Sequence, residues 1–171
     1  MCSDRAKAKE LMSAKKIVFR ESRDDEIRDV VRMIKECFDR FIAPLYSDKG
    51  VHEFHSYIEP EAIAQRLREN HTLFVALEST KGRIVGALLL RAPSHISMLF
   101  VSSAFQGRGI GKKLFHLASE KCRQADPSPV KISVNASPNS VEICERLGFV
   151  AHGEEQIING IRFLPMECKM A

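Results

Sequence analysis

The chain has 171 residues, a length that fits one domain with a substantial core. Its hydrophobic fraction of 44% and charged fraction of 28% are ordinary for a globular protein, and no apolar stretch reaches the length of a membrane span, so no membrane partner is expected. The net charge of +4 is too small and too scattered to indicate nucleic acid as a partner.

The N-terminus carries charges but lacks the apolar core of a secretory signal, and residues 1–15 hold few apolar side chains. We therefore expect a peripheral lead-in at residues 1–15 and a single domain over residues 16–171. The five cysteines are widely separated and include no Cys-x-x-Cys pair, so neither a zinc site nor a redox pair is indicated. Reduced thiols in a cytoplasmic protein are the simplest interpretation.

In the N-terminal half, apolar spacing predicts a strand, two helices and a hairpin. Asp24 or Asp25 is expected to cap the first helix, and Pro60 suits the first turn of the second. The turn Lys81-Gly82 should connect the hairpin strands. Residues 41–59 mix aromatic, histidine and turn residues, and no regular element is assigned to them. The expected elements are strand 17–19, helix 27–38, helix 60–67, strand 73–77 and strand 84–90.

In the C-terminal half, two helices alternate with strands. Ser137 is expected to cap the second of these helices, with Pro138 in its first turn and Gly148 at its end. The expected elements are strand 95–101, helix 109–123, strand 130–134, helix 138–147 and an antiparallel pair, 149–152 with 161–168. The element order predicts a mixed sheet with helices on its faces, an α/β or α+β fold.

A glycine-rich turn joins strand 95–101 to the following helix; it is Gln106-Gly107-Arg108-Gly109-Ile110-Gly111-Lys112, called the glycine loop below. Such a turn gathers backbone N–H groups that have no intrahelical partner, and the helix dipole adds positive charge. An anion, most often a phosphate, fits this place. A plain turn with a glycine-rich helix start is the alternative.

The glycine spacing excludes two common phosphate loops. A Walker A loop would need a glycine at Gln106 and a hydroxyl at Lys113, so nucleotide hydrolysis is not expected. A dinucleotide fingerprint beginning at Gly107 would need a glycine at Lys112.

Three blocks, in family order, resemble the GNAT N-acetyltransferase superfamily. Gln106-x-x-Gly109-x-Gly111 after a strand is similar to its acyl-CoA signature, residues 134–149 are similar to its second conserved block, and residues 160–167 are similar to the closing strand of a bacterial-type branch. The resemblance covers residues 17–169. It implies a mixed, mostly antiparallel sheet flanked by helices and splayed between its fourth and fifth strands.

The resemblance also implies how acetyl-CoA would be held. The glycine loop would bind the diphosphate through backbone N–H groups, and the backbone of Leu99, Phe100 and Val101 would pair with the pantetheine arm like an added strand. An N–H near Val101 would stabilise the oxyanion. Asn135 and Ser137 are secondary cofactor contacts, and no metal is needed.

The implied chemistry is direct attack of a primary amine on the thioester. His95 begins the fourth strand, near the place where histone-modifying relatives carry an acidic catalytic residue, and it is the expected base. An ordinary hydrogen-bonded histidine is the alternative. Cys144 stands where many relatives carry a tyrosine that protonates the leaving thiolate. It is either a weaker acid or a small buried side chain.

Acceptor recognition is expected in residues 41–60, where Tyr46, Glu53 and Phe54 offer aromatic walls and one carboxylate for a cationic amine. The same side chains could instead cover the core. The sequence thus predicts an N-acetyltransferase for a small-molecule or protein amine; the alternative is a CoA-binding GNAT-like module with weak or no catalysis. The resemblance leaves the choice between monomer and homodimer open.

Overall fold

The computed structural model describes residues 16–128 and 131–170, so the expected lead-in at residues 1–15 lies outside it. The strands are β1 (Ile17–Glu21), β2 (His71–Glu78), β3 (Arg83–Arg91), β4 (His95–Val101), β5 (Lys131–Ala136), β6 (Val150–Ala151), β7 (Gln156–Ile158) and β8 (Ile161–Lys169). The α-helices are α2 (Ile27–Phe41), α3 (Asp48–Tyr57), α4 (Pro60–Glu69), α5 (Ile110–Ala125) and α6 (Val141–Arg146). Single 3-10 turns are η1 (Asp24–Glu26), η2 (Ala43–Leu45) and η3 (Ser103–Phe105).

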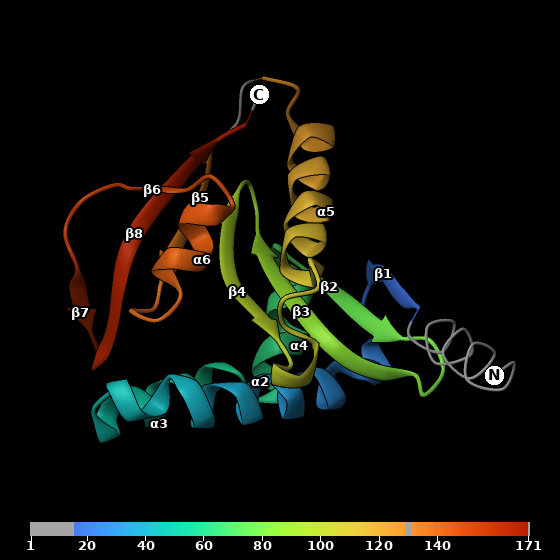
Figure 1. The fold of residues 1–171 in the computed structure, drawn as a ribbon, viewed down its shortest axis with the longest axis horizontal. Coiled ribbons are helices and arrows are strands. Elements are labelled where there is room, and N and C mark those ends of the chain that lie inside the picture. Colours follow the sequence, from blue (N-terminus) through green and yellow to red (C-terminus); the bar gives the residue numbers. More distant parts are fainter. Residues whose placement is uncertain (1–15, 129–130, 171) are drawn as a thin grey trace, which may run out of the picture.

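The strands form a sheet in the order β1-β2-β3-β4-β5-β8-β6, with β7 paired to β8 (Figure 1). Neighbouring strands are antiparallel except β4 and β5, which are parallel and pair only through His95 with Ser133 and Ile96 with Val134. Beyond these pairs β4 and β5 separate towards α2 and α3. The predicted splay between the fourth and fifth strands is therefore confirmed.

The two faces of the sheet carry separate cores. One core joins α5 and α6 to strands on both sides of the splay, and it includes Leu114, Ile132, Cys144 and Met166. The other core joins α2 and α4 to β2, β3 and β4, and none of its members comes from β5 or β8. On the opposite side, β8 is contacted by α3 and by Tyr46, but no residue of β5 or β8 belongs to the α2 core.

A β-bulge at Ser97 sets which way the end of β4 faces. Met98 pairs with Leu89 and Ile96 pairs with Leu90, which leaves Ser97 as the extra residue. Ile96 and Met98 would otherwise share a face, but Ile96 packs in the α5 core and Met98 in the α2 core. The bulge therefore reverses the side-chain alternation just where β4 leaves β5.

Three local expectations need correction. Residues 41–59, expected to be irregular, contain α3, which Ser47 caps by accepting a hydrogen bond from Gly50 N at 3.2 Å. Ser137 does not cap α6, because its Oγ lies 2.8 Å from Asn139 Oδ1 and 2.6 Å from Ser140 Oγ, and the helix begins at Val141. Pro138 therefore precedes the helix.

The first helix and the C-terminal hairpin also differ in detail from expectation. Asp24 and Asp25 lie within η1 and do not cap α2, which begins at Ile27. The expected pairing of residues 149–152 with 161–168 is confirmed by β6 and β8, while β7 is an additional strand on β8. The hairpin of β2 and β3 is confirmed.

Candidate functional site

The glycine loop follows η3 at the end of β4 and leads directly into α5. Gly107 and Gly109 have φ angles of 75° and 74°, a left-handed conformation that other residues adopt with strain. The first main-chain hydrogen bond of the helix runs from Lys113 N to Gly109 O, at 3.1 Å. The N–H groups of Ile110, Gly111 and Lys112 therefore precede the intrahelical ladder and are available to an anion.

Gln106 fastens the glycine loop to the strand that precedes it. Its Nε2 donates a hydrogen bond to the carbonyl oxygen of Val101 at 3.1 Å. The Cys37 thiol on α2 lies 3.6 Å from the same oxygen. The side chain of Gln106 is thus turned back to β4, and any cofactor contact from this residue falls to its backbone.

Arg108 is held against an aromatic ring. Its guanidinium lies 4.9 Å from the centroid of Phe105, and that of Arg83 lies 5.2 Å from the same centroid. Arg83 also pairs with the buried carboxylate of Glu78 at 3.2 Å. Phe105 is only 4% exposed, so its ring is fixed in the core. Its contacts with Arg83 and Arg108 therefore keep both guanidinium groups beside the glycine loop.

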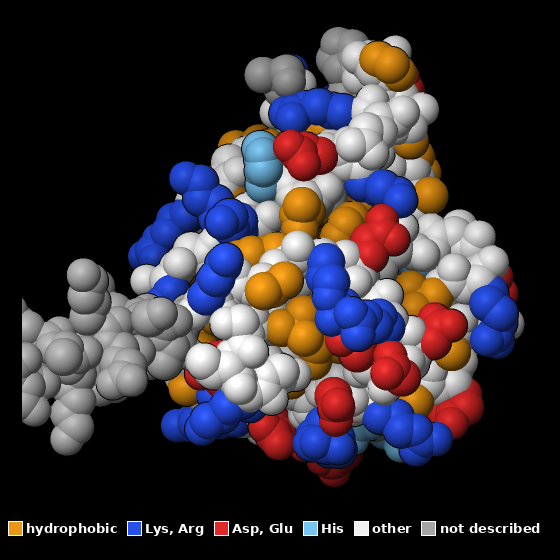
Figure 2. Space-filling model, turned by 90° about the vertical axis from the view of Figure 1, so that its right-hand side faces the viewer, with side chains coloured by type: hydrophobic (Ala, Val, Ile, Leu, Met, Phe, Trp, Pro, Cys, Tyr) orange, Lys and Arg blue, Asp and Glu red, His pale blue; other side chains and the backbone are white. Residues whose placement is uncertain are grey.

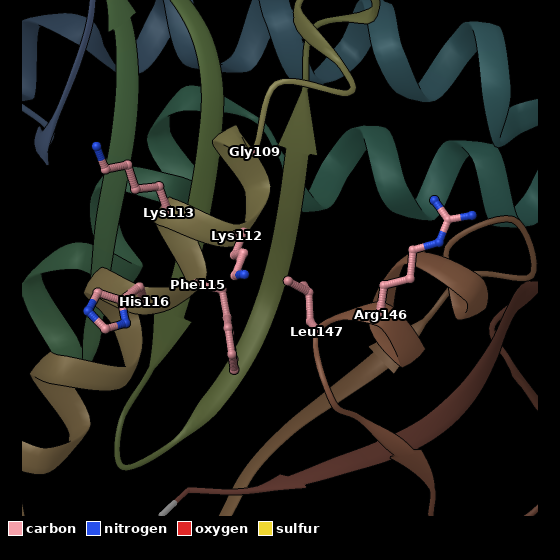
Figure 3. Close-up of a pocket in the computed structure, with 7 residues that line it drawn as sticks. All are labelled: Gly109, Lys112, Lys113, Phe115, His116, Arg146 and Leu147. Atoms are coloured by element: carbon pink, nitrogen blue, oxygen red, sulfur yellow. The ribbon is translucent and has the colours of Figure 1, made fainter.

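A pocket of about 350 Å³ opens between the first turns of α5 and the end of α6 (Figure 3). Its walls combine basic or histidine side chains with two apolar ones. They are Gly109, Lys112, Lys113, Phe115, His116, Arg146 and Leu147. The volume falls within the usual range for small-molecule sites, and the charges suit an anionic ligand.

Sequence reasoning found only part of this pocket. Gly109 and Lys112 were expected to bind the cofactor, and Lys113 adjoins them in the chain. Phe115, His116, Arg146 and Leu147 were missed. Helical periodicity signals that Phe115 and His116 lie one turn beyond the loop, but the proximity of α6 depends on tertiary packing.

His95 lies at the closed end of the splay, where β4 still pairs with β5. Its Nδ1 is 2.8 Å from Ser133 Oγ. Burial, with Arg91 and His71 nearby, lowers the pKa of His95 to about 4. The ring is therefore neutral at physiological pH, and it is a weaker base than an exposed imidazole.

Cys144 lies on the inner side of α6, 7% exposed, within the core shared with α5. Burial and the charge of Glu145 raise the pKa of its thiol to about 11, so the thiol stays protonated at physiological pH. Both the packing role and the proton-donor role remain predictions, and the burial supports the first.

The predicted acceptor residues separate into two groups. Phe54 stacks on Phe38 with ring centroids 3.9 Å apart and lies 6.0 Å from Phe100 on β4. Tyr46 meets the edge of Phe38 at 5.7 Å and donates its hydroxyl proton to the carbonyl oxygen of Arg162 at 3.0 Å. Glu53 is exposed on α3 and takes no part in these ring contacts.

The segment after β5 bridges the opening of the splay. Asn135 is exposed near the end of β5, and Ser137 is bonded within its own turn. Asn139 donates from Nδ2 to the carbonyl oxygen of Phe41, at the end of α2, at 3.3 Å. A side-chain hydrogen bond thus connects α2 to the turn before α6 across the opening, in addition to the one from Tyr46 to Arg162.

A row of polar residues crosses the sheet at the closed end of the splay. Register places His71 opposite Arg91, Arg91 opposite His95, His95 opposite Ser133, and Ser133 opposite Glu167. Sequence reasoning found only His95 in this row. The other members were not identified because strand register cannot be read from their own segments.

Figure 2 shows the face of the molecule that contains β1, where Lys and Arg lie among Asp and Glu in the central and lower parts and gather without acidic neighbours at the upper left. Over residues 16–128 and 131–170, no group of three or more His, Cys, Asp or Glu side chains could hold a metal ion. In the same part of the chain, every helix is too short or too polar to cross a bilayer.

The sequence matches a family model described as an acetyltransferase (GNAT) domain over residues 42–170. No curated protein matches the sequence. Among solved structures, a GCN5-related N-acetyltransferase from Rhodopseudomonas palustris has a TM-score of 0.76 at 22% identity, covering 92% of this chain and 98% of that one.

Two further structures show the same fold with different ligands or substrates in their names. The PaiA N-acetyltransferase of Thermoplasma acidophilum, solved in complex with coenzyme A, has a TM-score of 0.71 at 16% identity and covers 91% of this chain and 99% of that one. A chimera based on spermidine N-acetyltransferase from Vibrio cholerae has a TM-score of 0.60 at 19% identity, covering 90% and 95%. At these identities the likeness concerns the fold.

Proposed function

Because the chain belongs to the GNAT acetyltransferase family, we propose that it transfers an acetyl group from acetyl-CoA to a primary amine of a small molecule or a protein. The observation that carries this proposal is the separation of β4 from β5 beside the glycine loop. An unpaired strand edge thus meets a helix N-terminus, which suits a ligand with an amide-bearing arm and a diphosphate.

The described residues fit acetyl-CoA at both ends. The N–H groups of Ile110, Gly111 and Lys112 would hold the diphosphate, and Lys112 and Arg146 add positive charge in the adjoining pocket. The backbone of Leu99, Phe100 and Val101 would bind the pantetheine amides. When bound, acetyl-CoA supplies the activated thioester carbonyl that the amine attacks.

His95 is the proposed proton acceptor. Six residues of strand, about 20 Å, separate His95 from Val101 along β4, so a proton from the acceptor ammonium would reach the neutral His95 ring through a relay of water molecules. The freed nitrogen lone pair forms the C–N bond. A backbone N–H near Val101 stabilises the oxyanion of the tetrahedral intermediate. The C–S bond then breaks with its electron pair on sulfur, and the second proton of the nitrogen passes to the thiolate while His95 releases its proton to solvent.

Tyr46 and Phe54, which pack on the buried ring of Phe38, are proposed to contact the acceptor, since Phe54 reaches Phe100 on the cofactor strand. Aromatic faces attract a cationic amine. Glu53 would contribute as an exposed carboxylate at the entrance, outside the ring cluster.

A second candidate function is CoA binding with weak or no catalysis. The low pKa of His95 makes it a weak base, and the thiol of Cys144 is buried in the core. Both observations favour a domain that holds the cofactor and turns over slowly.

The test combines calorimetry with acetyl-CoA and thiol release over a panel of small amines and peptide amines. Binding with amine-dependent thiol release supports the enzyme, and binding without release supports the CoA-binding module. Absence of binding overturns both. His95→Ala should lower turnover more than cofactor affinity, and unchanged turnover would remove His95 from its role.

Two substitutions of Cys144 test whether this residue acts in proton transfer or only in packing. Cys144→Ala with full turnover would assign the residue to packing. A faster Cys144→Tyr enzyme would indicate that this chain lacks the acid that a tyrosine supplies in its relatives.

A further inference from the structure

Asn135 projects from β5 to the face of the sheet opposite α5. Its neighbours along the strand, Val134 and Ala136, belong to the α5 core or pack against it. Because side chains alternate along a strand, Asn135 lies on the other face, towards which α2 and α3 close the open end of the splay (Figure 1). Its side chain is exposed, and its amide has no hydrogen-bond partner among the described residues.

Phe163 on β8 lies on the same face as Asn135. Its neighbour Leu164 packs against the α5 core, so the Phe163 ring projects away from α5. Asn135 pairs with Pro165, which makes Phe163 its diagonal neighbour at a spacing of about 7–8 Å, a distance that an aromatic ring can span. The ring is half-buried and belongs to neither of the two cores that the described residues form.

The proposed acceptor rings lie on this same face, on the other side of the splay. Phe100 of β4 packs against the α2 core, and its ring lies 6.0 Å from that of Phe54. Tyr46 extends to β8, where its hydroxyl donates to the carbonyl oxygen of Arg162, the residue before Phe163, at 3.0 Å. Rings from both sides of the splay therefore border one opening.

The carboxylates nearest to this opening are engaged elsewhere or lie outside its rings. Glu167, on the same face at the closed end, has Lys131 Nζ at 3.4 Å and His152 Nδ1 at 3.6 Å. Glu53 is exposed on α3 and takes no part in the ring contacts. The opening is thus bordered by aromatic rings and one neutral amide, where a second ammonium group would lose hydration without gaining a carboxylate.

We propose that Asn135 and Phe163 contact the acceptor and not the cofactor, and that the acceptor is a primary monoamine with an apolar group, such as an arylalkylamine. This inference rests on the proposed function and adds to it the class of amine. Phe163 and Phe54 contact the apolar group, and the Asn135 amide oxygen accepts a hydrogen bond from the amino group. The resemblance implied a cofactor contact for Asn135, but the diphosphate would lie on the α5 side, beside the pocket at the glycine loop.

The direct test follows the side-chain amide of Asn135 by ¹H–¹⁵N NMR, with its signal assigned as the one that disappears in Asn135→Ala. CoA, which carries no acetyl group to transfer, should shift the main-chain signals of the glycine loop and leave the Asn135 side-chain signal little changed. Phenethylamine, added to that complex or to the free protein, should shift the Asn135 signal. Spermidine at the same concentration should shift it less.

An Asn135 side-chain signal that responds to CoA and not to phenethylamine would overturn the proposal and return this residue to the cofactor. A signal that responds to neither amine would overturn it as well, and a larger response to spermidine would overturn the apolar class of acceptor. None of these results depends on turnover, so failure of this proposal is distinct from failure of the proposed acetyl transfer.

Thiol release with phenethylamine gives a second test. Phe163→Ala should raise the KM for the amine by about 10-fold or more, as expected when a specificity pocket loses apolar contact, and leave the KM for acetyl-CoA unchanged. Phe163→Leu keeps part of the contact and should give an intermediate KM. Ile157→Ala is the control, since Ile157 is 65% exposed on β7 and pairs with Arg162 on the opposite face. A KM for the amine that is equal in Phe163→Ala and Ile157→Ala would overturn the role of Phe163.

Discussion

Two of the left-handed glycines occupy turns that differ in their place in the molecule. Gly109, with φ of 74°, starts α5 within the glycine loop, and Gly82, with φ of 60°, forms the turn between β2 and β3. A Cβ at either position would meet no atom within 4 Å. Glycine is therefore required at both positions by the backbone conformation and not by a lack of space. Of the two, only Gly109 is proposed to contact a ligand.

We expect Gly109→Ala and Gly82→Ala each to lower the free energy of unfolding by about 1–2 kcal/mol, the strain of a left-handed alanine. Only Gly109→Ala should also weaken acetyl-CoA binding, because the backbone at the start of α5 would shift. Urea titration and calorimetry measure the two effects. Equal cofactor affinity in both variants would contradict the proposed role of the loop.

The pKa of His95 predicts a pH dependence of stability. The folded pKa of about 4 lies below the value near 6.5 of an unfolded chain, so between these values only the unfolded state binds the proton. Stability should fall as pH decreases through this window, by at most about 1.4 kcal/mol per pH unit from this residue.

The measurement is the free energy of unfolding at several pH values from 7 to 4. The decrease should be smaller in His95→Gln than in the wild type. His52→Gln, at an exposed position of α3, should follow the wild type. A slope in His95→Gln equal to that of the wild type would show that the buried ring does not titrate as described.

At the scale of elements, the hydrophobic periodicity predicted most strands and helices. The prediction failed where another interaction determines where a helix forms or begins. Helix α3 was missed because glycine at position 50 weakens a helical pattern, while the structure requires it: a Cβ there would come 2.1 Å from Gly160 O. The start of α6 was misplaced because Ser137 bonds Ser140 instead of a helical N–H.

For the candidate site, the glycine loop was predictable from local spacing alone. The contribution of Arg146 to the pocket and of Ser133 and Glu167 to the polar row was not, because each depends on which elements become neighbours. A local sequence pattern indicates which helix or strand a segment can form. The register between strands that are distant in the sequence is determined by the packing of the whole core.

Substitution of Gly50 in α3 tests the close packing of that helix, and substitution of Gly111 in α5 is the control. Gly50→Ala should destabilise the protein by about 1–3 kcal/mol, since the backbone of Gly160 cannot yield as a side chain does. Gly111→Ala, whose Cβ would make an ordinary 3.8 Å contact with Val101 Cγ2, should be neutral or stabilising through helix propensity. Thermal unfolding distinguishes them, and similar melting temperatures would contradict the packing of α3 on β8.

At the scale of the molecule, the sheet consists of two parts joined by few backbone pairs. The part from β1 to β4 meets the part from β5 to β8 through two residue pairs, the core beneath α5 and α6, the contact of α3 with β8 and two side-chain hydrogen bonds, Tyr46 to Arg162 and Asn139 to Phe41. A ligand bound along the edge of β4 would bridge the parts and reduce their relative motion.

Hydrogen exchange measures this effect. Acetyl-CoA should slow exchange in residues 98–101 and 131–136, on both sides of the splay. Exchange in β1, at the far edge of the sheet, should change little. Protection confined to the glycine loop would mean that the cofactor does not occupy the space between β4 and β5.

Because only two residue pairs join β4 to β5, the chain could be cut into two fragments between these strands. The chain passes from one part to the other once, after α5, through an exposed stretch that contains Asp126 and Ser128. A break there would leave two fragments whose union depends on the shared core and on a few strand contacts. If acetyl-CoA binds along β4 as proposed, it would favour the reassembly of such fragments.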